Sequence, residues 1–371
     1  MIKRNITKTL FFIFVFLLTS LNLFAQKSIV KKLLSNGKDS TRAASFIPLP
    51  AIGYAQETGW GFGIVALYSY YADRADTLTR SSLISGLASY TTKKQSNFFI
   101  KADIWTPQNK LHHTEEIRLK NFPFYYYGIG NNTLEANKEL VKHKLFKVKG
   151  ELQKKMSKST FTGIDASFEN YTYASEIGTQ LEDGNVLLLG VSEIIDSRNI
   201  NTYTTKGFFI GLNYAYAPNV FGSTNFSGSL LKLNLKNFTA LNSKLVLGIN
   251  ANYESLFGNS SPFYLLRQLG SDEMMRGYYG GRYRDKNFIA AQAELRYRFM
   301  PRFGIVGFAG QGSVYKKEFK LAELKPSYGA GFRYFFDVER GLSIRIDYGI
   351  GEKLANEKRQ KGMYISLGES F

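Results

Sequence analysis

The chain has 371 residues, with 48 lysines and arginines against 30 aspartates and glutamates, a formal net charge of +18, and no cysteine. Without cysteine it forms no disulfide bond and has no cysteine-linked lipid anchor. After residue 25, no segment approaches the roughly 18 consecutive apolar residues of a membrane-spanning helix.

Residues 1–25 are typical of a secretory signal peptide. Basic residues precede an apolar run from Leu10 to Leu18, and Ala25 offers a small residue for cleavage. The alternative is an uncleaved membrane anchor, but the run is shorter than the ~20 residues that span a bilayer. We therefore expect an exported protein that starts with a polar periplasmic lead at 26–45, which is too short for a separate domain.

Export bears on the meaning of the positive charge, because an exported chain rarely meets nucleic acid. Anionic lipid headgroups, lipopolysaccharide phosphates or an anion-selective lumen fit this charge better. Solvated surface charge is the simpler alternative.

Residues 46–371 are predicted to form sixteen strands, an even number with lengths suited to crossing a bilayer at a tilt. Short polar turns join most neighbours, which predicts an all-β, antiparallel up-and-down barrel whose closure removes exposed edges. The predicted strands are 47–56, 59–72, 80–92, 95–106, 110–121, 142–155, 158–172, 185–197, 204–217, 223–237, 240–255, 287–300, 302–316, 322–337, 340–352 and 361–371.

Polar and apolar residues alternate most clearly in the later strands. In 287–300, Glu294 and Arg296 alternate with Leu295 and Tyr297. This period of two demands one polar and one apolar surrounding, which a transmembrane barrel provides as a wet lumen and lipid. Aromatic residues cluster near strand ends, as in membrane girdles, although a β-sandwich core would also use them. Strands before residue 160 alternate less clearly.

Long connections follow the fifth, seventh and eleventh strands, so all three lie at one end of the barrel. If the N-terminus is periplasmic, this end faces outside. The loop between the eleventh and twelfth strands carries Arg276, Gly277 and Tyr278, followed by Gly280 and Gly281. We expect these glycines to let the backbone turn tightly.

This loop and the next strand resemble the BamA/TamA superfamily of outer-membrane barrels, the bacterial surface antigen family. The family carries an Arg-Gly-aromatic tip between strands eleven and twelve of sixteen, matched by Arg276-Gly277-Tyr278. An acidic residue and a Glu-x-Arg follow in the family, matched by Asp285 and Glu294-Leu295-Arg296. Residues 54–63, 196–207 and 328–333 are also similar.

The resemblance implies that the long loop folds into the lumen and that Arg276 pairs with acidic residues of the barrel wall. Glu294 fits by motif and by its place on the polar face, and Asp347 fits by its place alone. A partly dehydrated arginine needs a carboxylate, and bidentate pairing would fix the loop. The alternative is an exterior loop whose Arg276 meets solvent.

Both ends of the chain bear on the resemblance. Assembly factors of the family carry periplasmic POTRA domains, which the short lead does not provide, so we expect a stand-alone barrel. The last predicted strand closes on Phe371, and a terminal aromatic resembles the signal that the bacterial barrel-assembly machinery recognises.

The chain shows no catalytic motif. His112 and His113 point to opposite faces of a strand and cannot share a metal. A hydrolase would need a serine and an acid beside one of them, and no nucleophile motif is present. The glycines between Gly59 and Gly63 suit a barrel wall better than a dinucleotide site, because no helix follows. We expect no enzyme, no cofactor and no metal.

The sequence thus favours an integral outer-membrane barrel that assists insertion or transport of proteins or lipids. Expected partners are outer-membrane lipids, including lipopolysaccharide, and other outer-membrane proteins, but no nucleic acid. The alternative is a passive or gated anion-preferring pore whose field comes from inward basic residues: Lys232, Lys236, Arg296, Arg298 and Arg345.

Overall fold

The computed structural model of the chain describes residues 42–55, 58–175, 181–222, 226–258, 260–338 and 341–371. The predicted signal peptide at 1–25 and nearly all of the predicted lead at 26–45 lie outside the described residues. Within the described ranges, no helix is long and apolar enough to cross a bilayer.

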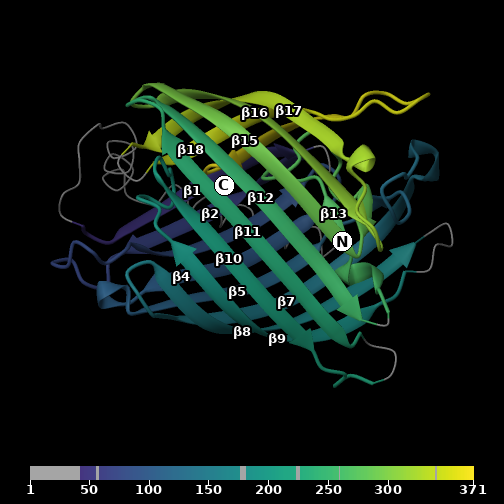
Figure 1. Cartoon of the computed structure of the whole chain (residues 1–371), viewed down its shortest axis with the longest axis horizontal. Coiled ribbons are helices and arrows are strands. Elements are labelled where there is room, and N and C mark those ends of the chain that lie inside the picture. The colour runs from purple at the N-terminus through teal and green to yellow at the C-terminus, as the bar shows by residue number, and fades with distance from the viewer. Residues whose placement is uncertain (1–41, 56–57, 176–180, 223–225, 259, 339–340) are drawn as a thin grey trace, which may run out of the picture.

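Sixteen long strands form one closed antiparallel barrel (Figure 1). Each long strand pairs with the next one along the chain, and the last pairs with the first. The predicted strand number and up-and-down order are confirmed. The barrel strands are β1 (Ser45–Ala55), β2 (Gly59–Tyr70), β3 (Ser82–Thr91), β4 (Ser96–Trp105), β5 (Leu111–Asn121), β7 (Glu139–Lys155), β8 (Thr160–Ser175), β9 (Gly184–Asp196), β10 (Gly207–Ala217), β11 (Gly228–Ala240), β12 (Leu245–Gly258), β15 (Asn287–Met300), β16 (Phe303–Tyr315), β17 (Lys325–Asp337), β18 (Leu342–Ile350) and β19 (Lys361–Leu367).

Short elements lie in the connections. A three-residue strand after β5 pairs with β7, and the loop between β12 and β15 contains a small two-stranded sheet. These elements are β6 (Phe124–Tyr126), β13 (Arg267–Leu269) and β14 (Tyr283–Asp285), together with the 3-10 turns η1 (Pro107–Asn109), η2 (Glu135–Asn137), η3 (Phe263–Leu265) and η4 (Leu321–Glu323).

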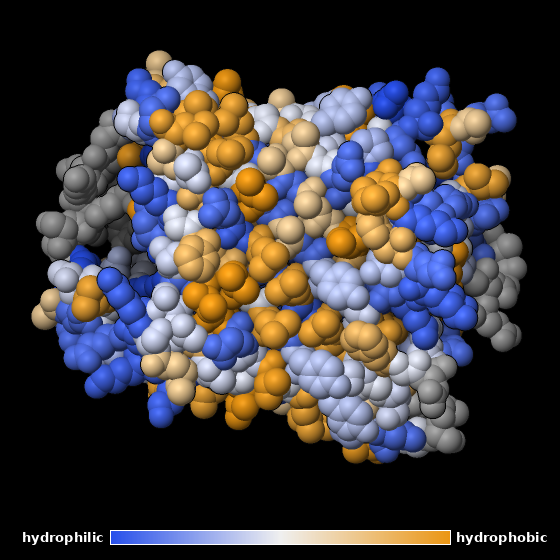
Figure 2. All heavy atoms as spheres, viewed as in Figure 1, coloured by the Kyte–Doolittle hydropathy of each residue, from blue (hydrophilic) through white to orange (hydrophobic). Residues whose placement is uncertain are grey.

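The barrel exposes apolar side chains and buries polar ones. On β15, Leu295 and Tyr297 are 45% and 40% exposed, whereas the alternating Glu294 and Arg296 are buried. Figure 2 shows apolar side chains gathered over the middle of the barrel and hydrophilic ones towards both ends. An exposed apolar belt of this extent suits contact with lipid rather than with water.

The predicted end of the last strand is wrong. β19 ends at Leu367 and not at Phe371. Gly368 has a φ of 77°, which breaks the extended conformation. The chain then turns to the inner face, where the Phe371 ring lies 5.8 Å from that of Phe238 and its carbonyl accepts a hydrogen bond from Arg296 at 3.0 Å.

Candidate functional site

The loop of residues 260–286, here called the β12–β15 loop, ends in a tightly turned tip. Three tip residues have a left-handed backbone: Met275 with φ 58°, Gly277 with φ 104° and Gly281 with φ 79°. Glycine adopts this region freely, whereas for methionine it costs roughly 1 kcal/mol. Met275 is completely buried, so packing holds it there. Gly280 is not left-handed, and the turn therefore depends on Gly277 and Gly281.

Arg276 ties the loop to the barrel wall. Its Nη1 donates to Oδ2 of Asp347 at 2.6 Å, and its Nη2 donates to Oε1 of Glu294. None of the three side chains has exposed surface. The guanidinium also lies over Phe308, 3.5 Å from the ring centroid. Because Glu294 is on β15 and Asp347 on β18, one loop residue joins two wall strands that are not neighbours.

Further arginines share the same two carboxylates. Arg296 lies 2.8 Å from Glu294. Arg333 and Arg345 both approach Asp347, at 2.5 Å and 3.2 Å. All three guanidiniums are buried. Each carboxylate therefore keeps a second arginine besides Arg276.

Two outer carboxylates balance the charge of this cluster. Glu369 accepts a hydrogen bond from Arg333 at 2.8 Å, and Asp272 of the loop accepts one from Arg345 at 2.6 Å. Four arginines thus meet four side-chain carboxylates, so the formal charges of these side chains cancel. Here it is called the ion network; it consists of Arg276, Arg296, Arg333, Arg345, Asp272, Glu294, Asp347 and Glu369.

The loop tip packs directly on the backbone of β18. A Cβ built on Gly349 would lie 2.5 Å from the carbonyl carbon of Arg276, closer than real Cβ atoms approach. Gly277 donates its N–H to the Tyr364 hydroxyl at 3.0 Å. Ser327 donates to the Arg276 carbonyl at 2.7 Å. The tip is therefore fixed by backbone contacts as well as by charge.

Tyr278, the third residue of the motif, is also completely buried. Its hydroxyl donates to the carbonyl of Pro326 at 2.6 Å and accepts from the N–H of Glu352 at 2.9 Å. Burial raises the pKa of this hydroxyl far above its usual range, with the Glu352 carboxylate as a further cause. It therefore stays a neutral donor at any physiological pH.

Asp285 lies away from Arg276. In the β13–β14 hairpin it stands opposite Arg267, and its carboxylate accepts the N–H of Lys286 at 2.8 Å. Burial raises the pKa of this carboxyl. Within the described residues it forms no ion pair, so it helps to shape the hairpin but does not hold the tip.

The basic residues expected to supply the field of a pore fall into three groups. Arg296 and Arg345 belong to the ion network and are neutralised there. Arg298 donates to the carbonyl of Pro301 in a turn. Lys232 and Lys236 lie on the inner face of β11 with no ion pair to another described residue.

The histidines are not arranged for a metal. His112 is buried and makes hydrogen bonds to Gln153 at 2.8 Å and Asp103 at 3.0 Å, while its neighbour His113 lies on the other face of β5. No group of three or more possible metal ligands occurs among the described residues.

The junction of the first and last strands is the weakest in the barrel. β1 and β19 have a single register pair, Tyr54 opposite Ile365, although each pairs along its whole length with its other neighbour. Pro48 and Pro50 of β1 have no N–H to donate, and proline is normally confined to sheet edges. Sequence reasoning could have found this signal in the two prolines. We call this junction the seam.

The comparisons with known proteins agree with the fold. The sequence model described as the Omp85 superfamily domain matches residues 89–371. The structure resembles BamA from Haemophilus ducreyi lacking POTRA domains 1-3, at 13% identity and a TM-score of 0.58, over 88% of this chain and 70% of that chain. It also resembles CdiB from Acinetobacter baumannii, at 12% identity and a TM-score of 0.54, over 92% of this chain and 67% of that chain. CdiB from Escherichia coli is similar at 9% identity and a TM-score of 0.58, over 88% of this chain and 62% of that chain. No curated protein matches the sequence.

Proposed function

Because the chain belongs to the Omp85 superfamily, we propose that it is an integral outer-membrane barrel that assists the insertion or transport of proteins or lipids. It acts without catalysis, through the seam. The observation that carries this proposal is the single register pair, Tyr54 with Ile365, that joins β1 to β19. We further propose that the chain is exported by the signal peptide at 1–25, so the mature protein should begin after Ala25 in mass spectrometry.

An open seam can act on another chain because it leaves backbone groups unpaired. In lipid, unpaired N–H and C=O groups are costly, and an incoming strand can satisfy them by adding to the edge. β19 is also among the shortest barrel strands, ending at Leu367. A short strand at the seam would thin the adjacent bilayer and lower the barrier for an amphipathic chain.

A disulfide lock across the seam tests this proposal. The chain has no cysteine, so Tyr54→Cys with Ile365→Cys introduces the only possible crosslink. The matched control is Leu247→Cys with Leu295→Cys, which stand opposite each other on β12 and β15. Each variant is supplied to cells depleted of the protein, and the outer-membrane proteins and lipids are quantified.

We expect the locked seam to fail to restore the depleted components under oxidising conditions and to recover with reductant. The control pair should restore them under both conditions. Full complementation by the oxidised, locked seam would overturn the proposal.

A further inference from the structure

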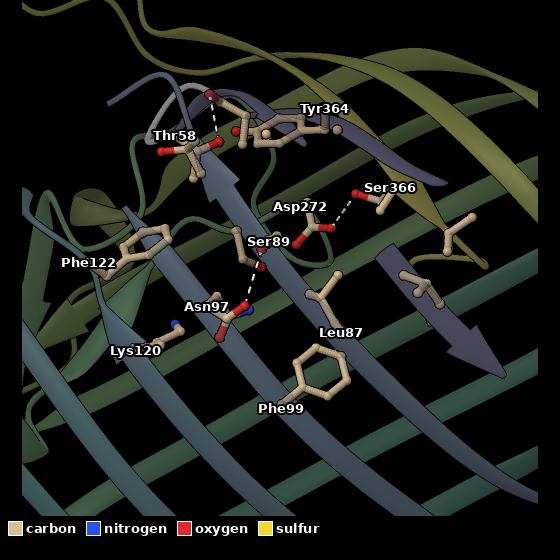
Figure 3. A pocket seen from close by; sticks show the side chains of 18 of the residues that line it. Thr58, Leu87, Ser89, Asn97, Phe99, Lys120, Phe122, Asp272, Tyr364 and Ser366 are labelled. Carbon is tan, nitrogen blue, oxygen red and sulfur yellow. Dashed lines mark hydrogen bonds between the residues drawn. The ribbon is translucent and has the colours of Figure 1, made fainter. Parts of the chain in front are cut away.

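A large cavity lies between the β12–β15 loop and the inner face of the first barrel strands. Its volume is about 1180 Å³, larger than the roughly 300–1,000 Å³ of most small-molecule sites. The lining comes from β1 to β5, from β7 and β8, from the loop tip and from the two sides of the seam. Figure 3 shows part of it, with Leu87 and Phe99 beside each other on one wall.

One wall of the cavity is apolar although it faces the barrel interior. Val65, Leu87 and Phe99 line this wall and stand directly opposite one another on β2, β3 and β4. Leu49 of β1 stands opposite Val65 and continues the row. Inner faces of membrane barrels are usually polar, because water fills the lumen. Here this row of four residues is called the apolar row. The apolar row gives the cavity an apolar surface, and covering that surface with an apolar group instead of water is energetically favourable.

The other end of the cavity is basic. Lys120 Nζ lies 4.9 Å from the ring centroid of Phe122, and the Arg284 guanidinium carbon lies 5.1 Å from that of Phe124. His143 contacts both of these phenylalanines. Its backbone carbonyl accepts a hydrogen bond from the Phe122 N–H at 2.7 Å, and its ring centroid lies 5.9 Å from that of Phe124. Lys120, Arg284 and His143 all line the cavity. Two cations and an imidazole therefore gather at one end.

These basic groups lack the acidic partners that the ion network has. Arg284 is only 2% exposed, and its side chain donates Nε–H to the carbonyl of Gly281 at 2.9 Å. Within the described residues, neither Arg284 nor Lys120 has a carboxylate at ion-pair distance. The buried Nε2 of His143 has no hydrogen-bond partner there either. Burial lowers the pKa of Arg284 to about 10. A buried cation without a partner is costly, so an anion would be bound favourably here.

The cavity reaches the lipid-facing surface through the seam. Its lining includes Tyr364 on the inner face and also Ile52 and Leu367, which lie on the outer face on opposite sides of the seam. Ile52 and Leu367 are 58% and 43% exposed. Asp272, the carboxylate that lines this side, is paired with Arg345 at 2.6 Å. The basic end therefore carries the uncompensated charge of the cavity.

We propose that this cavity binds one anionic lipid. The lipid phosphate lies at Lys120 and Arg284, and an acyl chain covers the apolar row after entering from the membrane through the seam. Charge complementarity selects a phosphate, and the adjoining apolar wall selects a lipid over a soluble phosphate. The inference rests on the proposed function only in that the seam opens towards lipid.

Lipid binding is measured on the full chain in zwitterionic detergent by native mass spectrometry. The probes are dioleoyl phosphatidylglycerol, dioleoyl phosphatidylcholine with identical chains, and glycerol phosphate without chains. Lys120→Gln with Arg284→Gln removes the two cations. Lys232→Gln with Lys236→Gln removes the same charge from β11, outside the cavity. Leu83→Gln with Leu87→Gln makes the apolar wall polar.

We expect the native chain to bind phosphatidylglycerol about tenfold more tightly than phosphatidylcholine, as two charge-assisted contacts suggest. The Lys120/Arg284 variant should lose this preference, and the Lys232/Lys236 variant should keep it. The Leu83/Leu87 variant should bind phosphatidylglycerol more weakly and glycerol phosphate unchanged.

Equal binding of the two lipids by the native chain would overturn the proposal, because the cavity would then accept any apolar segment. Glycerol phosphate bound as tightly as phosphatidylglycerol would assign the site to a soluble anion and overturn it too. The comparison of lipids on the native chain does not depend on any variant folding. It is also independent of the seam lock. The native chain can lack a lipid preference while the locked seam still abolishes function, and it can show the preference while the locked seam remains functional.

Discussion

Replacing Arg276 with alanine tests whether the ion network holds the loop in place. Breaking a buried ion pair by removing one partner typically costs about 3–5 kcal/mol. Here Glu294 keeps Arg296 at 2.8 Å, and Asp347 keeps Arg333 and Arg345. Neither carboxylate is left bare, which places the loss at the lower end of that range. We therefore expect Arg276→Ala to lower the free energy of unfolding by about 3 kcal/mol.

The loss is measured by urea unfolding in detergent, followed by the fluorescence of the two tryptophans. Arg359→Ala is the matched control, because Arg359 is an exposed loop arginine that makes one hydrogen bond to a backbone carbonyl at 3.2 Å. This control should stay within about 0.5 kcal/mol of the native chain. Arg276→Lys should fall between the two, since an ammonium cannot make the bidentate contacts of a guanidinium. If Arg276→Ala is as stable as Arg359→Ala, the ion network does not hold the loop.

Three further results are expected. Gly349→Ala should destabilise the barrel by about 1–3 kcal/mol through its clash with Arg276, whereas Gly307→Ala, whose Cβ meets nothing within 4 Å, should be neutral in the same urea titration. Burial acts to raise the pKa of Glu357, but hydrogen bonds from a backbone amide and from Arg282 leave it below its usual range. The stability that the Glu357–Arg282 pair contributes is present above the pKa of Glu357 in the unfolded chain, and it is lost as the pH falls through the pKa in the folded chain. We therefore expect Glu357→Gln to reduce the loss of stability on the acid side of a stability–pH curve. In planar bilayers we expect low, flickering conductance, and a large, steady, anion-selective current would support the pore instead.

The strands could be predicted because one-residue alternation is a local property of the sequence. The prediction of 287–300 coincides with β15. The alternating inner residues from Gln292 to Arg298 are polar, whereas Phe288 and Ala290 are buried against apolar residues of the loop. The prediction of 240–255 missed the start of β12 at Leu245. There the Asn242 side chain accepts the N–H groups of Lys244 and Leu245, both at 2.9 Å, and forms a turn. The polar run Asn242-Ser243-Lys244 is itself a turn signal, so the start of this strand could have been predicted from the sequence.

The contact partners of Arg276 could be anticipated only in part. Glu294 and Asp347 were selected by motif and by their place on a polar face, and the structure brings both to Arg276. Arg333 and Glu369 were not selected, because their contacts depend on how β17 and the chain end lie across the closed barrel. Alternation shows which face a residue occupies, but not which residues meet across the lumen. The turn after Leu367, which brings Glu369 inward, has Gly368 as its only sequence signal.

The weak alternation before residue 160 follows from the same physics that makes the later strands clear. A period of two appears only where the two faces of a strand meet different surroundings. Strands β15 and β18 alternate clearly beside the ion network, where Glu294 and Asp347 are buried and their neighbours Leu295 and Ile346 are exposed. Strands β1 to β4 carry apolar residues on both faces, because their inner face holds the apolar row. The ion network and the bound loop therefore occupy the inner side formed by β15 to β18, and the apolar row occupies the inner side of β1 to β4 next to the seam. An amphiphile entering at the seam would meet the apolar row first, and Lys120 and Arg284, which have no carboxylate partner among the described residues, lie beyond it.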